Sequence, residues 1–155
     1  MPAFHVLKEN SLPWSVAPHR LPEIVQATAP AEHPLPLDLH DLAERCLGSF
    51  ELVERLLNSF EQRFWPEVEQ LERALAAGNA ELAARVVHTL KGATANVSAE
   101  RLRRVVAQIE NVLRSGSLED LRAPLEQLRH EWEQFNKAVS YQRSAISRQL
   151  LADSQ

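Results

Sequence analysis

The sequence predicts an all-α protein, an antiparallel up-down-up-down four-helix bundle with a short extra helix on its N-terminal side. Two observations carry this prediction. Apolar residues recur every three or four positions over four long segments, the spacing of one buried helix face. The turns between these segments are only two or three residues long, which makes consecutive helices antiparallel neighbours. We see no strand pattern and no internal repeat.

Residues 1–36 are predicted to be a Pro-rich linker or arm. Seven of the nine prolines fall there, and each removes an amide donor and fixes φ. The bundle is expected over residues 37–139. Asp38 is the predicted N-cap of the short helix, and Gly48 and Ser49 separate it from the first long one.

The first long helix is expected from about Phe50 to Ala77. Pro66 interrupts it, so we expect either a kink near Gln62–Trp65 or two abutting helices. Gly78 and Asn79 fit a C′ glycine followed by an N-cap. The next helix runs to about Val97.

Ser98 is predicted to end this helix and to cap the following one, which ends at Gly116-Ser117. The last helix is expected to begin near Ala123. Its apolar pattern thins beyond Lys137, so residues 140–155 are predicted to be a fraying C-terminal tail.

Composition excludes several classes of protein. The net charge of −4 disfavours nucleic-acid binding, and no apolar run is long enough to span a membrane. The single cysteine, Cys46, excludes an internal disulfide and a cysteine-cluster metal site, and no secretory signal is visible. The histidines lack the spacing of a metal site, and there is no phosphate-binding loop. We therefore expect a cytoplasmic, monomeric protein without metal or cofactor.

One helix carries a histidine that the core does not require. Its predicted buried stripe is Leu82, Val86, Leu90, Ala93 and Val97, and His88 falls opposite that stripe. The residues expected around His88 on the exposed face are Ala84, Arg85, Lys91, Gly92 and Ala95. An exposed imidazole is a good phosphoryl nucleophile. The exposed Gly92 costs helix stability without a packing reason, which favours the close approach of a partner or a phosphoryl group.

Arg101, Arg103 and Arg104 form a basic cluster at the start of the fourth long helix. It is either a solvated face or a docking edge for an acidic partner.

The run from His88 to Asn96, His-Thr-Leu-Lys-Gly-Ala-Thr-Ala-Asn, resembles the phosphoacceptor motif of histidine-containing phosphotransfer (HPt) domains of bacterial multistep phosphorelays. The resemblance extends from about Leu37 to Val139 and includes Glu110. Where the family commonly has glycine, this chain has Ser98.

The resemblance implies a phosphoryl carrier without an ATP-binding catalytic domain, not an enzyme. His88 would accept the phosphoryl group from the phospho-aspartate of a receiver domain and pass it to a response-regulator receiver. Lys91 would contact the phosphoryl oxygens and Gly92 would give the receiver clearance. The partners would be receiver domains of a hybrid sensor histidine kinase and of response regulators, and magnesium would belong to the receiver. The alternative is a helical docking module that regulates a receiver or sensor kinase by binding alone.

Overall fold

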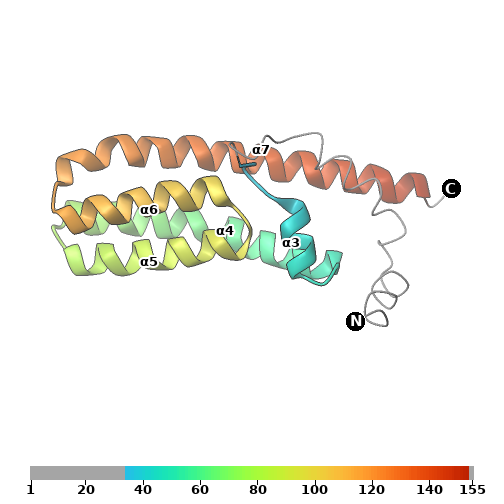
Figure 1. Cartoon of the computed structure of the whole chain (residues 1–155), viewed down its shortest axis with the longest axis horizontal. Helices are drawn as coiled ribbons and strands as arrows, with labels where there is room; N and C mark the ends of the chain where they lie inside the picture. Colours follow the sequence, from blue (N-terminus) through green and yellow to red (C-terminus); the bar gives the residue numbers. More distant parts are fainter. Residues whose placement is uncertain (1–33, 154–155) are drawn as a thin grey trace.

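The structure, a computed structural model, describes residues 34–153, and this part of the chain is all-helical as predicted. Its elements are α3 (Leu39–Arg45), α4 (Phe50–Ala76), α5 (Ala80–Asn96), α6 (Glu100–Ser115), the 3₁₀-helix η2 (Leu118–Leu121) and α7 (Arg122–Asp153). Figure 1 shows the four long helices side by side, with short turns at alternate ends. The predicted arm, residues 1–36, lies almost wholly outside the described residues.

Three helices begin where the capping residues predict. The side chains of Asp38, Ser49 and Asn79 each accept a hydrogen bond from the backbone N–H three residues later. Each bond satisfies one of the N–H groups that a helix start leaves without a partner. Gly78 has a φ of 69°, which is the left-handed conformation expected of a C′ glycine.

The prediction that Ser98 caps the fourth long helix is wrong. The N-cap of α6 is Ala99, which makes no side-chain cap hydrogen bond. Ser98 itself has a φ of 56°. Its hydroxyl donates to Asp41 Oδ2 at 2.6 Å and accepts from Arg45 NH1 at 3.0 Å. The backbone N–H of Ser98 donates to the Ala95 carbonyl and that of Ala99 to the Thr94 carbonyl, which is the pattern of a helix C-terminus. Ser98 therefore ends α5, and its hydroxyl, bound to α3, does not cap α6.

Pro66 does not divide the first long helix in two. α4 is one helix of 27 residues with Pro66 inside it. Phe64 and Val68, on either side of the proline, are both buried. Because tertiary packing of an amphipathic face supplies most helix stability, it outweighs one missing hydrogen bond.

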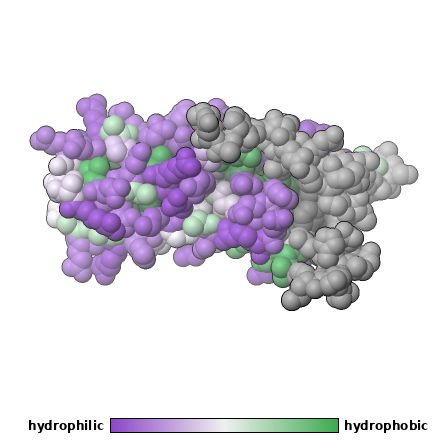
Figure 2. Space-filling model, viewed as in Figure 1, coloured by the Kyte–Doolittle hydropathy of each residue, from purple (hydrophilic) through white to green (hydrophobic). Residues whose placement is uncertain are grey.

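The core joins all the helices and includes a cluster of aromatic rings between α4 and α7. Trp132 of α7 stacks on Phe64 of α4 with ring centroids 4.8 Å apart, and Phe135 meets Phe60 edge-on at 5.1 Å. Such pairs each add about 1 kcal/mol beyond the area they bury. In the view of Figure 2, the described surface is mainly hydrophilic.

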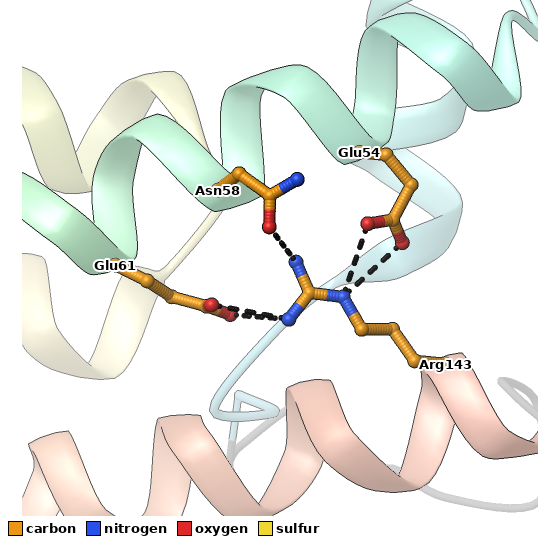
Figure 3. Close-up of polar contacts among 4 residues, drawn as sticks. All are labelled: Glu54, Asn58, Glu61 and Arg143. Carbon is orange, nitrogen blue, oxygen red and sulfur yellow. Dashed lines mark hydrogen bonds and ion pairs between the residues drawn. The ribbon is translucent and has the colours of Figure 1, made fainter.

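The predicted fraying of residues 140–155 is wrong as far as Asp153, the last residue of α7. Ala145 and Ile146 are buried. The guanidinium of Arg143 lies between three side chains of α4, which Figure 3 shows. It binds Glu54 at 3.1 Å, Glu61 at 2.8 Å and Asn58 at 2.9 Å. These contacts hold the end of α7 against the start of α4.

Among residues 34–153, no helix combines the length and the apolar character that a membrane span requires.

Candidate functional site

His88 is exposed on α5, as the helical periodicity predicts. Ala84, Arg85, Gly92 and Ala95 are exposed on the same helix, and Lys91 is partly buried. The buried residues of α5 are Ala83, Val86, Val87, Leu90 and Thr94. Because Leu82 and Ala93 are only partly buried, the buried face is rotated slightly from the predicted stripe. The rotation leaves the exposure of His88 unchanged.

A groove of about 410 Å³ lies along the junction of α4 and α5 beside His88. Its apolar lining includes Leu56, Phe60, Phe64, Leu90 and Val97. Its polar lining consists of Ser59, Arg63 and Glu67 from α4 and His88, Thr89 and Asn96 from α5. The groove can therefore take an apolar ridge of a partner directly beside the imidazole.

Three polar residues of this groove are not predicted from the sequence: Ser59, Arg63 and Glu67. They repeat every four residues along α4, which places them on one face of the helix. The spacing gives that signal, but only the packing of α4 on α5 shows that the face borders His88.

Gly92 lies one turn beyond His88 and faces open space. A Cβ built on this glycine would meet nothing within 4 Å outside its own helix and neighbours. Close packing between helices therefore does not explain the glycine. Its absent side chain leaves the helix surface bare next to the imidazole.

Lys91 forms an ion pair with a residue of the neighbouring helix. Its Nζ donates to Glu110 Oε2 at 2.7 Å, and Arg114 donates to the other oxygen of Glu110 at 3.1 Å. The hydrogen bond from Lys91 is the largest cause that lowers the pKa of the Glu110 carboxyl below its usual 4.5. Lys91 thus lies beside His88 on α5 but binds a carboxylate of α6.

The remaining predicted site residues lie on two sides of His88. Ala84 lines a second groove, of about 580 Å³, together with Glu110 and Arg114. The carbonyl of Arg85 accepts the Thr89 hydroxyl at 3.1 Å. The carbonyl of Ala95 accepts Arg45 NH1 at 2.7 Å. The exposed face of α5 therefore has a groove on each flank and α3 at its C-terminal end.

The basic cluster on α6 is paired within the chain. Arg101 binds Glu131 at 2.7 Å, and Arg103 and Arg104 both bind Glu100. Two carboxylates pair with the three guanidinium groups and so offset most of the positive charge, which agrees better with a solvated face than with a docking edge for an acidic partner.

The fold and the site define a class of protein: a helical bundle that presents one exposed histidine beside a groove, with a cation and a bare glycine next to it. The family model of the Hpt domain matches residues 51–138, which is more than half of the chain. The chain therefore belongs to the Hpt-domain family. No curated protein and no solved structure shows significant similarity to it.

Membership of this family implies phosphotransfer in phosphorelay signalling. Hpt domains carry phosphoryl groups and interact with receiver domains of phosphorelay proteins. The matched residues begin in α4 and end within α7. α3 and the last part of α7 lie outside the match.

Proposed function

We propose that His88 is the phosphoacceptor of this domain. It accepts the phosphoryl group from the phospho-aspartate of one receiver domain and donates it to the aspartate of a response-regulator receiver. The observation that carries this proposal is the exposed imidazole of His88 beside a groove and a glycine with open space around it.

The chemistry is a pair of phosphoryl exchanges. A ring nitrogen without a proton attacks the phosphorus of the acyl phosphate, so a P–N bond forms while the bond from phosphorus to the aspartyl oxygen breaks. The aspartate leaves as a carboxylate. In the second exchange another aspartate attacks the phosphohistidine, and the imidazole is the leaving group. Neither exchange needs ATP, and we expect any magnesium to be bound by the receiver.

The neighbours of His88 have distinct roles in this proposal. Lys91 is three residues further along the helix, within reach of a group on the ring, and contacts the phosphoryl oxygens. Gly92 lets the receiver approach the helix closely. Ala84, Arg85 and Ala95 form part of the surface that the receiver covers.

Transfer from a phosphorylated receiver tests the assignment. The wild-type chain should gain a phosphate that is labile in acid and stable in base, and His88→Gln should gain none. His130→Gln is the matched control, because His130 is an exposed histidine on α7. Phosphorylation of His88→Gln at the wild-type level would disprove the role of His88.

The second candidate function is docking without phosphorylation. The apolar lining of the groove favours it, since such a groove can bind a partner with or without phosphoryl transfer. Under this alternative the wild-type chain binds receivers but gains no phosphate from any of them, and His88→Gln leaves the affinity unchanged.

A further inference from the structure

The ion pair between Lys91 and Glu110 connects the helix that carries His88 to α6. We propose that Glu110 is a positioning residue: it draws the ammonium of Lys91 away from a phosphoryl group on His88 and so keeps that group transferable. This inference rests on the proposed function. It adds to the site a residue that lies 22 positions from His88 in sequence, on another helix.

The geometry places the carboxylate between two cations of unequal exposure. The Lys91 and Glu110 side chains are 35% and 17% exposed, whereas Arg114 is 71% exposed. Glu110 therefore holds Lys91 in a partly buried contact, where charges are screened less than at the surface. Arg114, at 3.1 Å, occupies the other oxygen from the solvent side.

A phosphoryl group on His88 would compete with this carboxylate. An ammonium has three donors, and Lys91 uses one of them on Glu110. A phosphoryl group brings a charge of about −1.5 to −2, so the ammonium would then serve two anions. Sharing Lys91 weakens its hold on the phosphoryl oxygens, and the carboxylate also repels them. Both effects raise the free energy of the phosphorylated state and favour onward transfer.

A purely structural ion pair predicts something different. If Glu110 only tied α5 to α6, its replacement would lower the free energy of unfolding and leave the electrostatics of the phosphoryl group unchanged. The second ionisation of a phosphoryl group on His88 separates these possibilities, because nearby charge changes it directly.

The experiment uses the full chain phosphorylated with phosphoramidate, and ³¹P NMR follows the second acid dissociation constant of the phosphohistidine. Glu110→Gln removes the negative charge and keeps the side-chain shape, so the constant should rise about two- to fivefold, the range of a partly exposed ion pair. Lys91→Met should lower it by a similar factor. Glu110→Gln should have a smaller effect in the Lys91→Met background than in the wild type, because Glu110 acts through Lys91.

Two further variants control for charge and folding. Glu100→Gln makes the same charge change on α6, ten residues from Glu110 or about 15 Å along the helix, and should leave the constant unchanged. Glu110→Asp keeps the charge, so its second acid dissociation constant should stay near the wild-type value. The other charged groups around the site are unchanged in the Glu110 variants: Arg63 and Glu67 on α4, Arg85 on α5 and Arg114 on α6.

The outcomes distinguish this inference from the function on which it rests. An unchanged or lower constant in Glu110→Gln, with normal phosphotransfer by the wild type, overturns the role of Glu110 alone. A wild-type chain that takes up no phosphoryl group at His88 from phosphoramidate or from any receiver overturns the proposed function and this inference together. The inference is supported if Glu110→Gln raises the second acid dissociation constant of the phosphohistidine and also shifts the phosphotransfer equilibrium with the receiver toward phosphohistidine.

Discussion

Gly92→Ala should raise the stability of the protein and lower its rate of phosphotransfer. Alanine is more favourable than glycine in a helix interior by about 1 kcal/mol. The added Cβ would meet nothing within 4 Å, so no clash offsets this gain. For a domain of this size, about 1 kcal/mol raises the melting temperature by roughly 3–6 °C. Circular dichroism during heating measures that increase.

The same methyl group lies where the proposed receiver approaches, so the rate of phosphotransfer from a phosphorylated receiver should fall. Ser140→Ala, at an exposed position of α7 outside the surface that we propose the receiver covers, is the control. It should raise the stability by roughly 0.5 kcal/mol through helix propensity and leave the rate of transfer unchanged. If Gly92→Ala gains stability and transfers at the wild-type rate, the clearance role of Gly92 is refuted. If Gly92→Ala is less stable than the wild type, the inference that an added Cβ at this position causes no clash is refuted.

Three further predictions concern the contacts that hold the bundle. Ser98→Ala should lower the free energy of unfolding by about 1–2 kcal/mol, because it removes hydrogen bonds to two charged groups. Ser98→Gly should lower it by about 1 kcal/mol less than Ser98→Ala does, because glycine adopts the left-handed backbone conformation without strain. Arg143→Met should cost about 1–3 kcal/mol and speed hydrogen exchange in the last turns of α7. The pKa of Glu110 is lowered on folding, so its stabilising contribution is complete above the unfolded value of about 4.5 and is lost as the pH falls through the folded value.

Each of these has its own control. Urea titration compares the two Ser98 variants, and equal stability of both would contradict the strain argument. Arg148→Met, at an exposed position of α7, should leave exchange unchanged, and an equal effect there would contradict the specific role of Arg143. As the pH falls below about 4.5, the unfolding free energy of Glu110→Gln should decrease less steeply than that of the wild type. Identical pH profiles would contradict the contribution of Glu110.

Local signals in the sequence predicted much of the fold and the exposure of His88. Asp38, Ser49 and Asn79 act through hydrogen bonds that span three residues, so the local sequence contains both the side chain and its partner. His88 and Gly92 were placed by periodicity, which depends only on the helix repeat. These predictions needed no knowledge of how the helices pack.

The errors occurred where distant residues determine the local structure. Serine favours the N-cap position, which predicts Ser98 there, but Ser98 ends α5 in the left-handed conformation and Asp41 and Arg45 bind its hydroxyl. The thinning of the apolar pattern predicts that the last part of α7 frays. Arg143 binds α4 residues more than eighty positions away, and no spacing along α7 reveals those partners.

The partner of Lys91 was hidden for the same reason. A lysine three residues from His88 suggests a free cation for the phosphoryl group, and only the packing of α6 on α5 shows that Glu110 already binds it. This contact changes how the proposed site works. A lysine held by a carboxylate gives up part of that interaction when it binds a phosphoryl group, so its net contribution is smaller than that of a free lysine. A phosphoryl carrier must release the group that it accepts. A lysine that is already bound to a carboxylate stabilises the phosphohistidine less than a free lysine would, and so permits that release.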